Sequence, residues 1–172
     1  MIEKSTIQKV LAVFFENPSR EFHLRELSRL LKLSMPTIIS TTDKLAKEKL
    51  ITKEKGRVLT KVIANRDNIY FLRYKRVYNL ELIYSSGIVD FISQAYNQPK
   101  CIILFGSFSR GEDTEKSDID IAVITKKKLS LDFSQYEKAL KKSINLHEVD
   151  LDKISEEFKA NLANDIVLEG SW

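Results

Sequence analysis

The sequence predicts an α+β protein in which a mostly helical first part is followed by a part built on apolar strands. Up to about residue 50, apolar residues recur at the three- and four-residue intervals of amphipathic helices. From residue 51 short β-like runs appear, and two later runs, 101–105 and 119–124, are almost wholly apolar, as in strands buried on both faces. Charge divides the chain in a similar way: residues 1–80 hold 17 Lys and Arg against 8 Asp and Glu, whereas residues 81–172 hold 11 against 16. The basic part suggests a polyanionic partner, and the acidic part suggests solvation or sites for cations.

Length and composition limit the class of protein. The 172 residues, 43% of them hydrophobic, suffice for one ordinary domain or two compact ones. No apolar run approaches the roughly 20 residues of a membrane span, and the first residues lack the order of a secretory signal. We therefore expect a cytoplasmic protein with no membrane partner. The single cysteine, Cys101, lies in an apolar run and is expected to be a buried thiol without a chemical role.

Three helices and a hairpin are predicted at the start of the chain. The first helix covers about residues 7–14 and ends at Asn17-Pro18, and the second carries the leucines between 24 and 31. Ser34 is a candidate cap for a third helix that accepts a proline in its first turn. Its expected buried stripe contains Ile38, Ile39, Leu45 and Ala46. Runs at 51–55 and 57–63, joined at Lys55-Gly56, indicate a tight hairpin.

This pattern, over about residues 3–64, resembles the winged helix-turn-helix family. In such domains the third helix enters the major groove and the hairpin, or wing, lies along the phosphates. The resemblance implies double-stranded DNA as the partner; RNA, docking onto a protein, or a dimerisation module are the alternatives. Carried over to this sequence, the residues that would face base edges are Thr37, Ser40, Thr41 and Lys44, and those that would meet the phosphate backbone are Lys53, Lys55, Arg57 and Lys61.

One or two connecting helices are expected over residues 66–97, with a break near 85–87. One helical stripe contains Tyr70, Tyr74, Val77 and Tyr78, and aromatic stripes at this spacing are usually core or a dimer seam. A homodimer is therefore among the expected partners. The predicted domains are a winged helix at 1–65, a helical connector at 66–85 and a second domain at 86–172.

The residues with the clearest chemistry follow the apolar run 101–105. A glycine at Gly106 permits close approach of a ligand, and the Ser107 hydroxyl and the following amides can bind phosphate oxygens. Asp118 and Asp120 flank Ile119 at the start of the next strand, so their side chains share one face about 6.6 Å apart. At an effective dielectric of about 20, two like charges at this range repel by roughly 2–3 kcal/mol. A magnesium ion would offset that repulsion, because Mg²⁺ is commonly held by one or two carboxylates plus substrate phosphates.

The stretch GSFSRGEDTEKSDIDIAVI resembles the signature of the polymerase-beta-type nucleotidyltransferase superfamily, particularly its minimal members. The resemblance covers about residues 86–170. It implies a mixed β-sheet flanked by helices, a Gly-Ser turn that grips the triphosphate of a nucleotide, and an aspartate pair that binds one or two Mg²⁺ ions. The marked positions of the minimal signature are filled by Gly106, Ser107, Arg110, Gly111, Ser117, Asp118 and Asp120.

Arg110 and Ser117 are carried over as nucleotide-binding residues. For Arg110, a surface ion pair with Glu112 or Asp113 is an equal alternative. The two histidines, His23 and His147, are given no role, because single histidines are more often surface or satisfied core residues than ligands.

The superfamily normally adds a third carboxylate on a later strand, which shares the catalytic metal ion with the aspartate pair or activates the attacking hydroxyl. Asp150 is the candidate, between Val149 and Leu151 in the run 145–151, with Glu148 and Asp152 as alternatives. A helix is expected before it, at 132–143, and one or two helices after it, at 154–168.

The resemblance implies an enzyme that moves a nucleoside monophosphate group from a nucleoside triphosphate, with ATP expected, to a hydroxyl of a protein, a nucleic acid or a small molecule. Minimal members of the superfamily are similar to antitoxins that modify a small helical toxin, so a HEPN-type toxin is a candidate partner. The fused winged helix adds the prospect of transcriptional control. The alternative is a regulator whose second domain only senses nucleotide.

Overall fold

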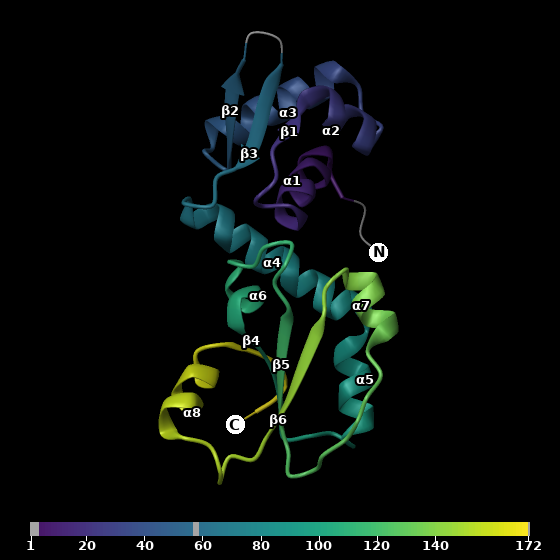
Figure 1. Cartoon of the computed structure of the whole chain (residues 1–172), viewed down its shortest axis with the longest axis vertical. Coiled ribbons are helices and arrows are strands. Elements are labelled where there is room, and N and C mark those ends of the chain that lie inside the picture. Colours follow the sequence, from purple (N-terminus) through teal and green to yellow (C-terminus); the bar gives the residue numbers. More distant parts are fainter. Residues whose placement is uncertain (1–3, 57–58, 172) are drawn as a thin grey trace. The chain divides into compact units, whose positions relative to one another are not determined.

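The computed structural model describes residues 4–56 and 59–171 (Figure 1). The chain divides into two compact units, Met1–Lys75 and Arg76–Trp172, which are described separately. Most of the predicted connector forms a single helix, α4 (Ile69–Ser86). On α4, Tyr70, Tyr74 and Val77 are more than half exposed, so this part of the aromatic stripe is not core. None of the helices in the described residues is both long and apolar enough to cross a membrane.

Unit 1 contains the three helices and the hairpin expected from the sequence. Ser5 and Ser34 cap the first and third helices by accepting backbone N–H donors, and a proline occupies the first turn of the third helix. Their inner faces form the core, whereas Ile39, expected in the buried stripe, is 42% exposed. The elements are α1 (Thr6–Glu16), β1 (Phe22–His23), α2 (Leu24–Leu31), α3 (Met35–Lys47), β2 (Ile51–Lys55) and β3 (Thr60–Ala64).

The strands of unit 1 form a small antiparallel sheet in the order β1-β3-β2. The short strand β1 was not expected from the sequence, because two residues show no periodicity. The hairpin connection lies slightly later than the Lys55-Gly56 join expected from the sequence: β2 ends at Lys55, the Gly56 N–H donates to the Leu59 carbonyl at 3.0 Å, and β3 begins at Thr60. Residues 57–58 at its tip lie outside the described residues.

Unit 2 is built on a four-stranded mixed sheet in the order β6-β5-β4-β7. β4 is antiparallel to both β5 and β7, and β5 is parallel to β6, so the expected mixed sheet flanked by helices is present. After α4, its elements are α5 (Ile88–Ala95), β4 (Cys101–Phe105), α6 (Gly106–Arg110), β5 (Ile119–Ile124), α7 (Ser134–Leu140), β6 (Ile144–Val149), α8 (Glu156–Ala163) and β7 (Ile166–Gly170).

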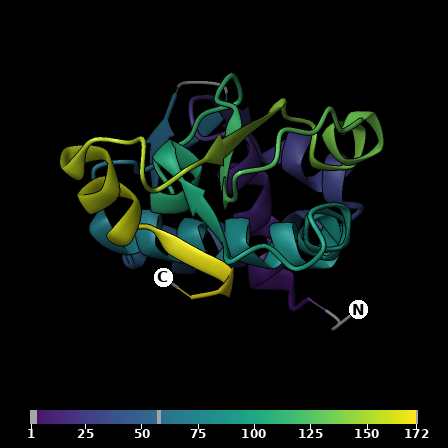
Figure 2. The ribbon, with the colours of Figure 1, turned by 90° about the horizontal axis from the view of Figure 1, so that it is seen from below.

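Helices cover both faces of this sheet (Figures 1 and 2). Side chains of α5 and α7 pack on one face with Ile102 and Leu104, and α8 packs on the other with Cys101 and Ile103. The two central strands are thus buried on both faces, as their apolar runs predicted. Cys101 is a buried free thiol, and burial raises the pKa of this thiol.

The end of the chain differs from the sequence prediction. The segment at 154–168 was expected to be helical throughout, but the helix ends at Ala163 and Ile166–Gly170 forms strand β7 along β4. A short run with β-branched residues is compatible with either structure. Pairing decides the outcome, because β4 would otherwise leave the backbone groups of one edge unsatisfied.

A largely buried lysine, whose side chain is 12% exposed, holds the loop that connects α6 to β5. Lys142, which follows α7, donates to the carbonyl oxygens of Thr114 at 2.5 Å and Ser117 at 3.2 Å. Its Nζ also lies 3.3 Å from a carboxylate oxygen of Asp113, whose side chain is 2% exposed and accepts a hydrogen bond from Asn79 at 2.7 Å. We call these three residues, Asn79, Asp113 and Lys142, the loop clamp. It fixes the segment that leads directly into Asp118.

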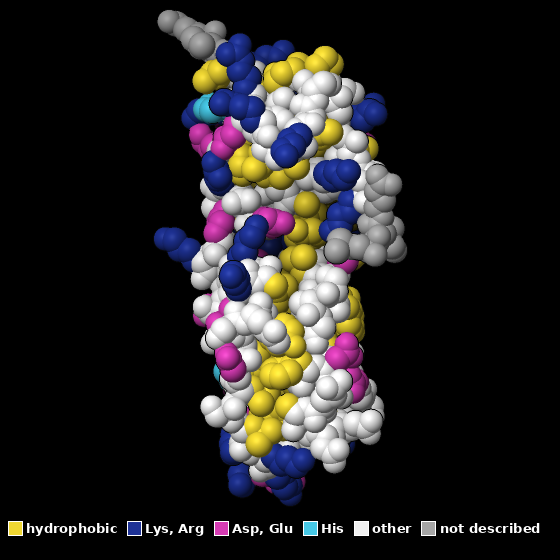
Figure 3. All heavy atoms as spheres, turned by 90° about the vertical axis from the view of Figure 1, so that its right-hand side faces the viewer, with side chains coloured by type: hydrophobic (Ala, Val, Ile, Leu, Met, Phe, Trp, Pro, Cys, Tyr) yellow, Lys and Arg dark blue, Asp and Glu magenta, His cyan; other side chains and the backbone are white. Residues whose placement is uncertain are grey.

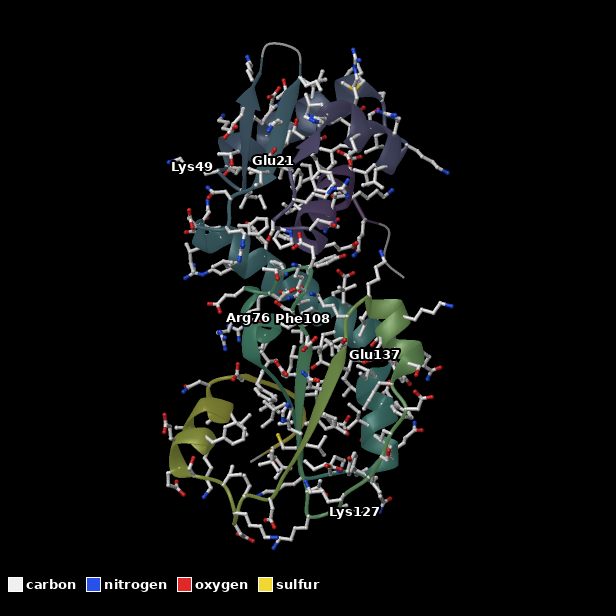
Figure 4. The ribbon with its side chains drawn as sticks, viewed as in Figure 1. Glu21, Lys49, Arg76, Phe108, Lys127 and Glu137 are labelled. Atoms are coloured by element: carbon white, nitrogen blue, oxygen red, sulfur yellow. The ribbon has the colours of Figure 1, made fainter. Side chains whose placement is uncertain are left out.

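One side chain of α6 and one of α7 hold the elements on either side of this loop in place. Phe108, labelled on α6 in Figure 4, is 1% exposed and packs into the core of unit 2, with the Lys142 Nζ 5.8 Å from its ring centroid. Glu137, labelled on α7, accepts the backbone N–H of Ile144 at 2.9 Å and so ties α7 to the first residue of β6.

Lys142→Met is expected to destabilise the protein by about 3 kcal/mol, because it breaks the ion pair with the buried Asp113 carboxylate and the hydrogen bonds to the Thr114 and Ser117 carbonyls. Urea unfolding followed by circular dichroism measures the loss. The matched control is Lys138→Met, the same change at an exposed lysine on α7, which should stay within about 0.5 kcal/mol of the wild type. Equal stability of the two variants would show that the clamp does not hold the loop.

Candidate active site

The turn between β4 and α6 brings Gly106 against Asp120. Phe105, the last residue of β4, is paired with Asp120 on β5, and the next residue, Gly106, has φ +78°. A Cβ atom built on Gly106 would lie 2.6 Å from Oδ2 of Asp120. Both the left-handed backbone and the close approach of the carboxylate therefore require glycine at this position.

The two aspartates lie on one face at the start of β5, as strand alternation predicts. Asp118 is exposed, immediately before the strand, and the Asp120 side chain is 27% exposed. Ile119, between them, is fully buried on the opposite face. The carboxylates thus sit at the boundary between the core and solvent, where a ligand can reach them.

A side-chain amide lies between the two carboxylates. In the parallel register of β5 and β6, Asn145 is paired with Asp120. Its Nδ2 donates to Oδ2 of Asp118 at 3.3 Å and to Oδ1 of Asp120 at 3.2 Å. One neutral amide group therefore offsets part of the repulsion between two like charges.

His147 is the next residue on the same face of β6. Its Nε2 lies 3.8 Å from Oδ1 of Asp120, too far for a hydrogen bond, and its ring meets the Phe105 ring at a centroid distance of 5.2 Å. Asn145 and His147 were not assigned a role from the sequence. Their alternation along one strand is visible there, but only the pairing of β6 with β5 places them beside the aspartates.

The structure does not bring Asp150 to the aspartate pair. Asp150 follows the end of β6, five residues beyond Asn145, which corresponds to roughly 16 Å along a strand. Its carboxylate accepts the backbone N–H of Asp152 at 3.2 Å and lies 3.4 Å from the Lys153 Nζ. Asp150 thus stabilises a turn, and the prediction that it shares a metal ion with Asp118 and Asp120 does not fit this geometry.

The two alternative third acids have structural partners of their own. Glu148 accepts hydrogen bonds from the Tyr96 hydroxyl and the Leu129 N–H, both at 2.7 Å. Burial by itself raises the pKa of Glu148, but these bonds and Lys128 outweigh burial and lower it overall. Asp152 pairs with Lys126 at 2.8 Å, and this hydrogen bond lowers the pKa of Asp152.

The remaining predicted nucleotide-binding residues differ in their accessibility. Ser107 is half-buried at the start of α6, and its hydroxyl makes no hydrogen bond to the residues that the structure describes. Arg110 is exposed and pairs with Glu112 at 2.8 Å, which is the surface ion pair that the sequence left as an alternative. The Ser117 hydroxyl accepts the N–H of Thr114 at 2.9 Å and so stabilises the loop before Asp118.

The donor set fits one hard divalent cation. Two carboxylates at an accessible edge match the protein ligands that Mg²⁺ takes when substrate phosphates and water supply the rest. A site built from three carboxylates is not assembled, and no group of three or more His, Cys, Asp or Glu side chains arranged to hold a metal ion occurs in 4–56 and 59–171.

On unit 1, the third helix presents only part of the face that was predicted to read DNA. Ser40 and Lys44 are exposed on α3, and Thr37 is half-buried with its hydroxyl 2.7 Å from that of Ser34. Thr41 is 6% exposed and belongs to the core. The prediction that it faces base edges does not fit this placement, because its helical phase directs it inward.

The basic residues of the hairpin are likewise divided. Lys55 is exposed at the end of β2, whereas the Lys53 side chain is only 13% exposed and donates to Asp43 at 2.7 Å. Lys53 is therefore engaged with α3. Lys61 is exposed but paired with Glu21 at 2.7 Å, and Arg57 lies outside the described residues. Figure 3 shows Lys and Arg side chains (dark blue) spread over one face of unit 1.

Gly106→Ala is expected to destabilise the protein more than Gly87→Ala. Both glycines have nearly the same left-handed backbone, φ +78° and +77°, but no atom lies within 4 Å of a Cβ built on Gly87. Each variant should lose about 1–2 kcal/mol through backbone strain. Gly106→Ala should lose roughly 1–3 kcal/mol more, because the new methyl group displaces the Asp120 carboxylate. Urea unfolding measures both losses, and equal losses would contradict the close packing.

Comparison with known families bears on the second unit. Residues 88–172 match the family model described as Polymerase beta, Nucleotidyltransferase. No curated protein and no solved structure matches the chain. The matched segment begins with α5 and contains the whole four-stranded sheet, the Gly106 turn and the aspartate pair. The match therefore supports a nucleotidyltransferase domain of the polymerase beta type in this segment.

Proposed function

We propose that this domain transfers a nucleoside monophosphate group from a nucleoside triphosphate, with ATP as the first candidate, to a hydroxyl acceptor. The observation that carries the proposal is the pair Asp118 and Asp120 on one strand face, packed against the Gly106 turn. The family match supports transfer chemistry in general. Mg²⁺ as the cation and the class of acceptor are our own extension.

In this proposal the residues of the turn and those of the strand have different roles. Asp118 and Asp120 hold a divalent cation, which supplies charge neutralisation and polarises phosphate oxygens. The free hydroxyl of Ser107 binds the triphosphate, and Gly106 lets it approach the backbone. The acceptor oxygen forms a bond to the α-phosphorus while the bond from that phosphorus to pyrophosphate breaks. The proton of the acceptor hydroxyl leaves to solvent, since Asp150 lies at the far end of β6.

We also propose that unit 1 is a winged helix that binds double-stranded DNA. Three helices and a hairpin with a third short strand, and the excess of Lys and Arg in residues 1–80, favour this function over a neutral docking domain. Within the described residues, Ser40 and Lys44 of α3 and Lys55 of the hairpin are exposed and carry the proposed contacts.

The first test is transfer of label from α-³²P nucleoside triphosphates in Mg²⁺ with cell extract as the source of acceptors. Asp118→Asn and Asp120→Asn should each lower transfer by at least about 100-fold, because they remove the charge that holds the cation. Asp150→Asn, the same chemical change at the turn after β6, should leave transfer unchanged. If no nucleotide labels any acceptor, yet nucleotide alters DNA affinity, the domain senses nucleotide instead of transferring it.

The second test is the salt dependence of binding to duplex DNA, measured by fluorescence anisotropy. A protein that neutralises phosphates gives a steep negative slope of log affinity against log salt, and each lost contact reduces the slope by about one. Lys44→Glu and Lys55→Glu should each weaken binding and flatten the slope. Lys9→Glu, the same charge change at an exposed residue of α1, is the control. A flat response in the wild type would defeat the DNA proposal.

A further inference from the structure

Asn145 lies where a third carboxylate would have to lie in order to share a cation with Asp118 and Asp120. It is paired with Asp120 across β5 and β6, and its amide is within hydrogen-bond distance of both carboxylates. The three acids predicted or considered at this strand, Glu148, Asp150 and Asp152, are engaged elsewhere. The side-chain group that contacts both aspartates is therefore an amide, which has both a hydrogen-bond donor and an acceptor.

We propose that Asn145 is the third member of the cation site and supplies a neutral oxygen ligand in place of a carboxylate. This inference rests on the proposed function, because it concerns the same cation. In the structure, the NH₂ end of the amide faces the two carboxylates. Rotation of the amide by about 180° brings Oδ1 to the same place, and carbonyl oxygens are suitable ligands for Mg²⁺ and Mn²⁺.

The distances favour Asn145 over His147 as a ligand of the cation. Adjacent ligands of one octahedral Mg²⁺, each bonded at about 2.1 Å, lie roughly 3.0 Å apart. The Asn145 amide nitrogen lies 3.2 and 3.3 Å from the two carboxylates, close to that spacing, whereas the His147 Nε2 lies 3.8 Å from Asp120. An imidazole nitrogen is also a poorer match to a hard cation than an amide oxygen.

Replacing a carboxylate by an amide changes the charge of the site. Asp118 and Asp120 together carry two negative charges, which one divalent cation neutralises, whereas three carboxylates would leave one in excess. The protein alone should therefore hold one cation. A second ion would need oxygen ligands and charge from the triphosphate itself.

Binding of Mn²⁺ alone, followed by isothermal titration calorimetry without nucleotide, tests the inference. Asn145→Leu is close in shape but has no oxygen, and it should weaken Mn²⁺ binding by at least about tenfold. If Asn145 only braces the carboxylates through its NH₂ group, removing it frees them, and binding stays unchanged or tightens. That outcome would overturn the inference. The wild type should bind one Mn²⁺; two would also contradict it.

Two variants separate this inference from the proposed function. Asp118→Asn should weaken Mn²⁺ binding, and Asp150→Asn should not. If Asp118→Asn weakens binding but Asn145→Leu does not, only the role of Asn145 fails. If neither Asp118→Asn nor Asn145→Leu weakens Mn²⁺ binding, the aspartate pair is not the cation site. The proposed function then loses the observation on which it rests.

A measurement on the unchanged protein covers the case in which Asn145→Leu fails to fold. Addition of Mg²⁺ should shift the side-chain carbonyl ¹³C resonance of Asn145, and its NH₂ protons should lose the shift caused by hydrogen bonding to carboxylates. If both resonances stay in place while Asp120 responds to Mg²⁺, the amide is not a ligand.

Discussion

The contact between Gly106 and the carboxylate of Asp120 is the constraint on which the rest of the site depends. Strand pairing places Asp120 opposite Phe105, so the residue that leaves β4 must turn away directly beside a charged side chain. Only a residue without a Cβ can do so at φ +78° with a carboxylate oxygen this close. The turn proposed to bind a phosphate and the carboxylate proposed to hold a cation are thus fixed relative to each other by the backbone.

The second support of the site comes from one short segment, residues 142–147. Its first residue, Lys142, closes the loop clamp and fixes the backbone just before Asp118. Three residues later Asn145 bonds both carboxylates, and His147 follows on the same face. Because β6 is parallel to β5, its register sets the positions of Asn145 and His147 beside the aspartates. The segment that leads into and begins this edge strand therefore positions both the loop and the charged pair.

The sequence predicts the local part of this arrangement well. Two strands buried on both faces, the glycine after the first and the aspartates on one face of the second all follow from residue type and alternation over a few positions. The order of helices and hairpin in unit 1 follows in the same way. Thr41 is an exception, because the phase of α3 is set by packing, which a mixed apolar and polar pattern leaves ambiguous.

What the sequence misses depends on pairing between distant segments. Asp150 was favoured because its apolar neighbours suit a strand, but the register of β6 against β5 decides which residue reaches the aspartates, and that residue is Asn145. The helix predicted for the end of the chain is wrong for the same reason: residues 166–170 form a strand because they pair with the edge of β4. A one-residue or five-residue difference in register changes a site completely while leaving local propensity untouched.

Under the proposed function, the neutral amide would also couple the cation to the nucleotide. A site with two carboxylates and an amide attracts a cation less strongly than one with three carboxylates, so the triphosphate must supply more of the ligands. Binding of each then favours binding of the other by the same factor, since coupling free energy is reciprocal. In the structure the Asn145 amide bonds both carboxylates and keeps the face assembled. Under the proposal, the same side chain would hold the cation firmly only together with its nucleotide.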